Sequence, residues 1–265
     1  MISDPWYKDR GDAMAGKPVV TACLIVIGNE ILSGRTQDAN LQYLGRALNA
    51  MGSRLAQARV IADDEETIVA TVNECRAAFD YVFTTGGIGP THDDITAAGV
   101  ARAFGVDLVR DPRAEAMLRQ HYRPEDVNAA RLKMAEVPAG ATLIENPVSK
   151  APGFQLDNVF VLPGVPRIMQ AMFDGIKHRL TGGQMVLSVA VAAYLPEGAM
   201  AEKLGRLQDT YTDIEIGSYP FVRDGRLGVS VVLRGAEAGR LDAAADDLRA
   251  LIRSLGAEPV EDPKT

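Results

Sequence analysis

Residues 84–96, TTGGIGPTHDDIT, combine several glycines with two adjacent carboxylates. They follow an apolar run of strand length, and ligands of open α/β sheets bind where such strands end. Glycine has no Cβ, so the backbone amides of Gly86, Gly87 and Gly89 can approach an anion closely. Together with Thr85, these glycines form a candidate phosphate-binding loop.

The two carboxylates, Asp93 and Asp94, would repel such an anion unless a cation lies between them. Mg²⁺ binds through one or two carboxylates together with substrate phosphates, which predicts a divalent-metal site at Asp93 and Asp94. Of the chain's three histidines, His92 alone lies in this segment, and it is a candidate ligand contact. The alternative is a tight turn in which one aspartate only caps the next helix. The common nucleotide motifs do not match, because Gly-Lys-Ser/Thr and the third glycine of the dinucleotide fingerprint are both missing.

Two later loops contain further candidate phosphate contacts. The segment NPVSKAPGF places Lys150 between two prolines, where its ammonium group can pair with phosphate oxygens as a point charge. The segment LPGVPRIMQ leads a strand into a helix through Gly164, and that helix start, assisted by Arg167, can hold a second phosphate. For Lys150, the alternative is a loop lysine that contacts only solvent. For the segment around Gly164, the alternative is a rigid turn that binds no ligand.

The elements that must position these residues alternate between strand and helix as far as residue 105. This alternation predicts βαβ crossovers and an α/β fold of three layers, a mostly parallel sheet with helices on both faces. Periodicity predicts strands at 19–27, 53–62, 81–85 and within 158–166, and helices at 38–51, after 64, from about 94, and at 167–180. Residues 111–140 are predicted to be helical, with breaks at prolines.

The pattern changes after residue 183 and predicts a second, smaller α+β domain over 184–260. It begins with a strand and a helix and continues as a hairpin around Asp224-Gly225, a strong turn signal. The hairpin's second strand is expected to bury Leu227, Val229, Val231 and Leu233 against a last helix that ends at Gly256. We therefore expect a mobile arm at 1–17, in which Trp6 is available to dock, a main domain at 18–180 and the small domain.

Four ordered motifs resemble a known family: GNEILSGRTQDAN, TGGIGPTHDDIT, NPVSKAPGF and LPGVP. They are similar to the molybdopterin-binding-like domain of CinA-type (competence/damage-inducible) proteins and to the corresponding domain of eukaryotic FAD synthase. The MogA and MoaB molybdopterin adenylyltransferases are more distantly similar. The resemblance covers about residues 19–180, and the small C-terminal unit looks like the second domain of CinA-type chains. These 265 residues leave no room for the nicotinamide mononucleotide deamidase domain of longer CinA proteins, so we do not expect that activity.

The resemblance implies catalytic roles for two aspartates. Asp94 matches the aspartate that is essential in adenylyltransferase relatives, and Asp63 matches the aspartate after their second strand. Both follow strands that we expect to be neighbours, where they would share one metal ion or orient a water. For Asp63 and Asp64, helix capping is the alternative.

The resemblance also implies ligand contacts within GNEILSGRTQDAN, at Gly28, Glu30, Asp38 and Asn40. For the last two, capping of the next helix is the alternative. This chain has Asn29 where the family usually has aspartate, which removes a charge there. It has Ser149-Lys150 where many members have Gly-Thr or Gly-Ser, so Lys150 marks a subgroup.

The function implied by the resemblance is metal-dependent hydrolysis of a nucleotide phosphoanhydride of the ADP-ribose or FAD class, a nucleotide pyrophosphatase activity. The alternative is a module that binds molybdopterin or a nucleotide, or transfers an adenylyl group, without hydrolysis. Both need the same hold on metal and phosphates, and no residue distinguishes them. The expected cofactor is Mg²⁺ or a similar ion, with molybdopterin as a further candidate ligand.

Composition narrows the partners and the compartment. The net charge of −7 opposes sequence-independent binding to nucleic acid, and every apolar run is much shorter than the ~20 residues that span a bilayer. The start of the chain has no signal-like apolar stretch, and the two cysteines, Cys23 and Cys75, are expected to be buried thiols. These features favour the cytoplasm and a small-molecule ligand. The edges of the small C-terminal sheet could pair between chains, so we also expect a homo-oligomer.

Overall fold

The structure, a computed structural model, describes residues 19–261. The predicted arm at 1–17, with Trp6, lies outside the described residues. The chain divides into two compact units, Met1–Gln184 and Met185–Thr265. The residues with candidate chemistry all belong to the first unit.

A six-stranded sheet forms the centre of the first unit, in the order β2-β1-β3-β8-β7-β6. The first four of these are parallel: β2 (Ser53–Ile61), β1 (Val20–Ile27), β3 (Tyr81–Thr85) and β8 (Val159–Leu162). The last two, β7 (Gly153–Leu156) and β6 (Thr142–Ile144), continue the sheet in antiparallel pairing. The predicted mostly parallel sheet is confirmed.

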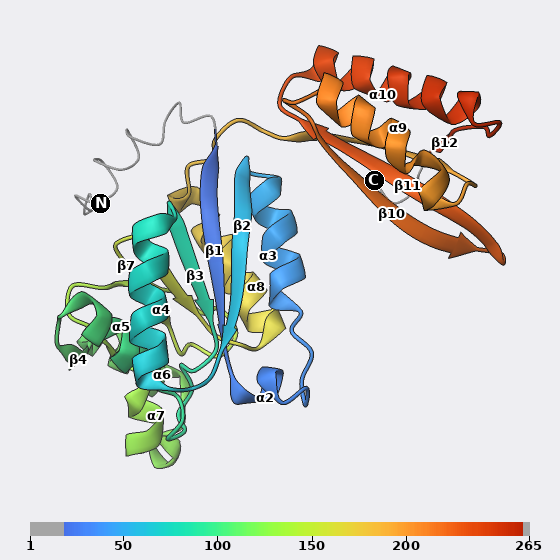
Figure 1. The fold of residues 1–265 in the computed structure, drawn as a ribbon. Coiled ribbons are helices and arrows are strands. Elements are labelled where there is room, and N and C mark those ends of the chain that lie inside the picture. The colour runs from blue at the N-terminus through green and yellow to red at the C-terminus, as the bar shows by residue number, and fades with distance from the viewer. Residues whose placement is uncertain (1–18, 262–265) are drawn as a thin grey trace. The chain divides into compact units, whose positions relative to one another are not determined.

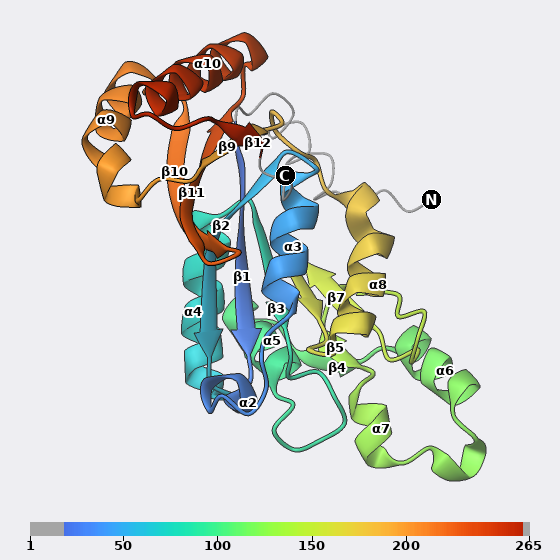
Figure 2. The ribbon, with the colours of Figure 1, turned by 90° about the vertical axis from the view of Figure 1, so that its right-hand side faces the viewer.

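Helices cover both faces of this sheet (Figures 1 and 2). One face packs against α4 (Glu65–Ala78) and α5 (Thr96–Phe104), the other against α3 (Asn40–Asn49) and α8 (Pro166–Ile176). Successive residues of a strand point to opposite faces, so Ile25 joins the core with α4 while its neighbour Leu24 joins the core with α3 and α8. β1 is buried on both faces, which explains its uninterrupted apolar sequence.

The segment between α5 and β6 differs in part from the prediction. It contains α6 (Pro112–His121), a 3-10 turn (Pro124–Asp126) and α7 (Ala129–Lys133), as expected. However, residues 136–138 form β5 (Glu136–Pro138), which pairs antiparallel with β4 (Leu108–Arg110). The helical prediction is wrong here, because a three-residue strand is too short to show a period of two and depends on its distant partner.

The second unit is a four-stranded sheet in the order β10-β11-β9-β12 with two helices. Its elements are β9 (Leu187–Ala193), α9 (Glu197–Thr210), β10 (Glu215–Arg223), β11 (Arg226–Gly235), α10 (Ala238–Ser254) and β12 (Val260–Glu261). The hairpin turns at Asp224-Gly225, both with positive φ, as predicted. Val229, Val231 and Leu233 are buried, but Leu227 is 65% exposed because it lies one residue from the turn, beyond the covering helices. The small α+β domain is confirmed.

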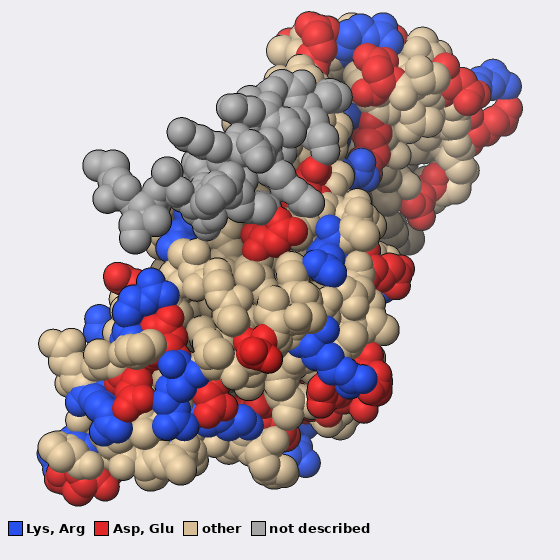
Figure 3. Space-filling model, turned by 90° about the vertical axis from the view of Figure 1, so that its left-hand side faces the viewer, with Lys and Arg blue, Asp and Glu red and all other residues tan. Residues whose placement is uncertain are grey.

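Three further features of the described residues bear on the sequence predictions. No helix among them is long and apolar enough to cross a membrane. Cys23 and Cys75 are free thiols, both buried, with their sulfur atoms 3.5 Å apart, and burial beside Cys75 raises the pKa of Cys23. On the face in Figure 3, basic and acidic side chains are interspersed rather than gathered by sign.

Candidate functional site

The glycine loop lies at the carboxyl ends of β1, β3 and β8. Gly86 donates its N–H to the carbonyl of Leu162 and has a φ of 104°, and a Cβ there would lie 2.1 Å from the carbonyl oxygen of Ile27. Gly87 has a φ of 65°, and its Cβ would lie 2.1 Å from Oγ1 of Thr96. Glycine is required at both positions because both have positive φ, and because a Cβ would meet the backbone of β1 at Gly86 and the side chain of Thr96 at Gly87.

A cavity of about 460 Å³ opens beside this loop. Its lining includes the loop glycines, the carboxylates of Glu30 and Asp94, and Gly164 at the start of the β8–α8 connection. Three polar residues that the sequence did not single out also line it: Thr36, Asn146 and Ser149. The structure therefore brings glycine amides, two carboxylates and several hydroxyl or amide groups to one cavity.

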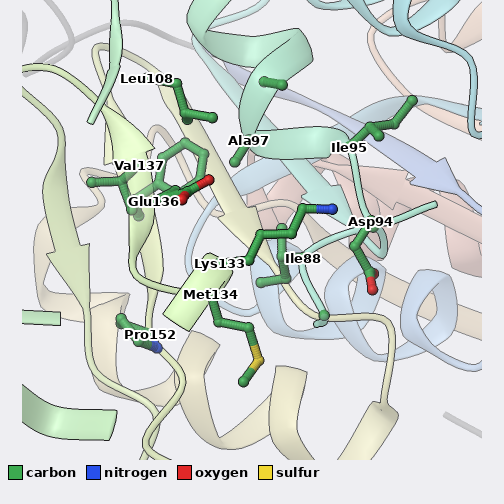
Figure 4. A pocket seen from close by; sticks show the side chains of 14 residues that line it. Ile88, Asp94, Ile95, Ala97, Leu108, Lys133, Met134, Glu136, Val137 and Pro152 are labelled. Carbon is green, nitrogen blue, oxygen red and sulfur yellow. The ribbon is translucent and has the colours of Figure 1, made fainter. Parts of the chain in front are cut away.

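A smaller cavity of about 70 Å³ adjoins the first and shares Gly87, Gly89 and Asp94 with it (Figure 4). Its walls are largely apolar, with Ile95, Leu108, Val137 and Phe154 among them. Two charged residues from the α7–β5 region complete it, Lys133 and Glu136. Asp94 thus stands where the two cavities meet.

Asp94 is held by its own loop rather than by the next helix. Its Oδ2 atom accepts hydrogen bonds from the backbone N–H of Thr91, at 2.8 Å, and from the hydroxyl of Thr91. α5 begins beyond it, with Ile95 as its N-cap and no side-chain capping bond. The capping alternative is therefore wrong for Asp94.

The two carboxylates of the predicted metal pair, Asp93 and Asp94, do not line the same cavity. Asp94 lines both cavities, whereas Asp93 lines neither and its side chain is 62% exposed. Among the described residues, no group of three or more His, Cys, Asp or Glu side chains is placed to hold a metal ion by itself. An ion at this site would need substrate oxygens to complete its coordination.

Asp63 and Asp64 have different partners. Asp64 is the N-cap of α4: it accepts hydrogen bonds from the side chain and the N–H of Thr67, which lower its pKa. Asp63 instead accepts the N–H of Asn29 at 2.8 Å and so supports α2 (Asn29–Leu32), the short helix that carries Glu30. The expectation that Asp63 and Asp94 follow neighbouring strands is wrong, because β1 lies between β2 and β3.

The two candidates at the start of α3 also differ. Asp38 accepts the N–H of Leu41 at 2.8 Å, the bond expected of a capping residue. Asn40 is buried, and its Nδ2 atom donates to the carbonyl of Gly164 at 2.8 Å. Its Oδ1 atom has no hydrogen-bond partner within residues 19–261. Asn40 therefore ties the start of α3 to the loop that lines the larger cavity.

Besides Asp38 and Asn40, five other predicted contacts lie outside both cavities in the described structure: Gly28, Thr85, His92, Lys150 and Arg167. Lys150 and Arg167 are exposed, and the side chain of His92 is 98% exposed. Thr85 is buried, with a hydroxyl that has no partner in the described part of the chain.

The loop that carries Lys150 contributes two other residues to the larger cavity, Asn146 and Ser149. Asn146 is 3% exposed; its Oδ1 accepts from the N–H groups of Val148 and Ser149, and its Nδ2 donates to the Ser149 hydroxyl and the Ala151 carbonyl. This network fixes the loop so that Ser149 faces the larger cavity. The Asn146-Pro147 step could have indicated this loop from the sequence, because asparagine often organises a turn through hydrogen bonds of its own side chain.

Comparison with known proteins agrees with this division of the chain. Residues 23–182 match a family model described as a probable molybdopterin binding domain, and residues 185–261 match one described as the middle domain of FAD synthase. The chain is 32% identical to a CinA-like protein of Salinibacter ruber, over 90% of this chain and 60% of that protein. It is 31% identical to a probable FAD synthase of Caenorhabditis elegans, over 88% and 50%.

A solved structure is also similar. The crystal structure of the protein CinA with unknown function from Thermoplasma acidophilum superposes with a TM-score of 0.57 and 36% identity, over 61% of this chain and 99% of that one. A relative from Archaeoglobus fulgidus is 36% identical over 74% of this chain and 84% of its own length. The chain therefore belongs to the family of CinA-type proteins with a molybdopterin-binding-like domain.

Proposed function

We propose that this protein is a metal-dependent pyrophosphatase that hydrolyses the phosphoanhydride of a nucleotide of the ADP-ribose or FAD class. One observation carries the proposal: a single cavity at the carboxyl ends of the parallel strands combines closely approachable glycine amides with the carboxylates of Glu30 and Asp94. Amides suit phosphate oxygens, and carboxylates suit the cation that accompanies them.

The residues present fit a hard divalent cation. Thr91 engages Oδ2 of Asp94, and within residues 19–261 no hydrogen bond engages Oδ1, which is available to a metal ion. Glu30 lines the same cavity, whereas Asp93 does not, so we assign the metal to Asp94 with Glu30. A bound Mg²⁺ would neutralise the phosphates and polarise the bond that breaks.

The surrounding residues then have separate tasks. The N–H of Gly86 is donated to Leu162, so the amides of Gly87 and Gly89 hold oxygens of one phosphate. The hydroxyl of Ser149, in the same cavity, can donate to the sugar or the second phosphate, whereas the side chain of Asn146 holds the loop that carries Ser149. Asp63 acts through its bond to Asn29, by holding the helix that carries Glu30. Hydrolysis adds water across the P–O–P bond and yields two phosphomonoesters.

The decisive experiment offers ADP-ribose, FAD, NAD and ATP with Mg²⁺, Mn²⁺ or Co²⁺ and separates the products by chromatography. We expect AMP with ribose 5-phosphate from ADP-ribose, or AMP with FMN from FAD, and no product in EDTA. Tight binding of these nucleotides without any product would overturn the hydrolase proposal.

That outcome would support the second candidate, binding of molybdopterin or a nucleotide, or adenylyl transfer. The description of the matched family as a probable molybdopterin binding domain favours it. A transferase would release pyrophosphate from ATP only when molybdopterin is present. A hydrolase would act on ADP-ribose or FAD alone.

A further inference from the structure

Lys133, the last residue of α7, differs from every other basic residue of the described chain. Of the lysines and arginines within residues 19–261, it alone lines either of the two cavities at the glycine loop. The acidic residues of these cavities number three, Glu30, Asp94 and Glu136. The larger cavity itself is lined by two carboxylates and by no lysine or arginine.

This charge pattern leaves a phosphate ligand incompletely balanced. A phosphoanhydride carries at least two negative charges, and a divalent ion between two carboxylates only cancels theirs. Charges of one sign in a partly enclosed site repel strongly, because the local dielectric is lower than that of water. A further positive group must therefore come close to the phosphates.

The position of Lys133 meets this need. Its Nζ atom donates to the carbonyl of Thr91 at 2.7 Å, and Thr91 in turn donates both its N–H and its hydroxyl to Asp94. Figure 4 shows the Lys133 side chain extending toward the glycine-loop segment, with Asp94 beyond it. An ammonium group has three donors, so the bond to Thr91 leaves two for a ligand.

We propose that Lys133 is the phosphate-binding cation of this site, in place of Lys150 and Arg167, and that it binds a non-bridging oxygen of the phosphoanhydride beside Asp94. The class of ligand rests on the proposed function, whereas the binding role does not require turnover. Because Lys133 lies in a different segment from the glycine loop, its bond to Thr91 also makes α7 part of the site.

The test measures binding of pyrophosphate and of the non-hydrolysable methylene analogue of ADP-ribose by calorimetry in Mg²⁺, with adenosine as a ligand that has no phosphate. Lys133→Gln should weaken binding of both phosphate probes at least tenfold, and Lys133→Arg should restore part of it. Any binding of adenosine should be unchanged. Arg131→Gln removes a charge from the same helix but lines neither cavity, so it should change affinity less than twofold. Equal melting temperatures would exclude unfolding as the cause.

Other results would overturn the assignment. Wild-type affinity in Lys133→Gln would do so, and so would a larger loss in Lys150→Gln or Arg167→Gln than in Lys133→Gln. Failure of the wild-type chain to bind either phosphate probe would also end it. Binding that depends on Lys133 without any hydrolysis would contradict the pyrophosphatase proposal alone, so the two failures are distinguishable.

Discussion

Two residues of the glycine loop are central to the candidate site: Asp94, through its carboxylate, and Gly87, through its lack of a Cβ atom. The carboxylate of Asp94 is oriented by Thr91 and stands where both cavities meet. Gly87 leaves room for the hydroxyl of Thr96, which donates to the carbonyl of Gly86 at 3.0 Å. One residue supplies charge and the other supplies space.

Asp94→Asn should abolish metal-dependent turnover and keep the fold. The amide retains the shape of the carboxylate, and its oxygen can still accept from Thr91, but it loses the charge that binds a cation. We expect a loss of at least about 100-fold in rate, of the order seen when one key electrostatic group is removed. Hydrolysis of the best substrate, compared at equal folded concentration, checks this. Wild-type rates in Asp94→Asn would contradict the assigned role.

Gly87→Ala should lower stability as well as ligand binding. Its φ of 65° alone costs about 1–2 kcal/mol for a residue with a Cβ, and the contact with Thr96 adds to that. Gly105→Ala is a matched control, because Gly105 has a φ of 66° and open space around its Cβ position. Urea denaturation of both variants should show the larger loss at Gly87. Equal losses would mean that the loop yields to the added methyl group.

Among the elements, α3 is joined by a hydrogen bond to the β8–α8 loop, which lines the larger cavity. Asn40→Ala removes the bond to Gly164 and should cost about 1 kcal/mol, a typical net value for one hydrogen bond. It should also weaken binding of ADP-ribose, since Gly164 lines the cavity. Asp38→Ala, which loses only the bond to Leu41, should reduce stability without that effect on affinity. Unchanged affinity in Asn40→Ala would show that other contacts hold the loop.

The start of α6 should make the stability of the first unit depend on acid pH. Asp111 caps this helix, and hydrogen bonds from the Arg113 side chain, with those from the N–H groups of Arg113 and Ala114, lower its pKa. Because the folded-state pKa lies below the unfolded value of about 3.9, the stabilisation is complete above that value and is lost as pH falls through the folded pKa.

Asp111→Asn should therefore flatten the loss of stability below about pH 4, since asparagine caps a helix without titrating. Asp111→Ala should cost about 1 kcal/mol at neutral pH, the usual cost of losing an N-cap. Denaturation curves recorded from pH 7 to pH 2 check both statements. A wild-type slope in Asp111→Asn would assign the acid sensitivity to other carboxyl groups.

On the scale of the whole molecule, each unit has its own hydrophobic core, and the proposed site lies entirely in the first. A fragment that ends at residue 184 should therefore retain ligand binding and turnover. A fragment that ends at 180 would lose three bonds. Thr181 donates its N–H to the Tyr81 hydroxyl and accepts from that hydroxyl at its carbonyl, and Gly183 donates to the carbonyl of Gly52.

The same fragment tests the expectation of a homo-oligomer, because light scattering compares its mass with that of the full chain. A smaller assembly would place the contact in the second unit, whose strand β10 is an edge strand. If a folded fragment 1–184 has no activity at saturating substrate and metal, the second unit must contribute to the site.

The layered α/β architecture, the small second domain and the glycine loop could all be predicted from the amino-acid sequence alone. These features depend on local patterns. Alternating apolar runs predict strands and helices, and a cluster of glycines after a buried strand indicates a site where other groups approach the backbone closely. Asp94 and Glu30 also belong to such local motifs, and the structure places both at one cavity.

Two findings required the folded structure. One is the basic residue that lines the smaller cavity at the glycine loop, and the other is the separation of Asp63 from Asp94. Lys133 lies at the end of a short helix with no motif around it, and it contacts Thr91, 42 positions away in the sequence, only in the folded chain. Strand order separates Asp63 from Asp94, and no local pattern encodes that order. Contacts between residues distant in sequence depend on packing of the whole unit, which periodicity and composition do not specify.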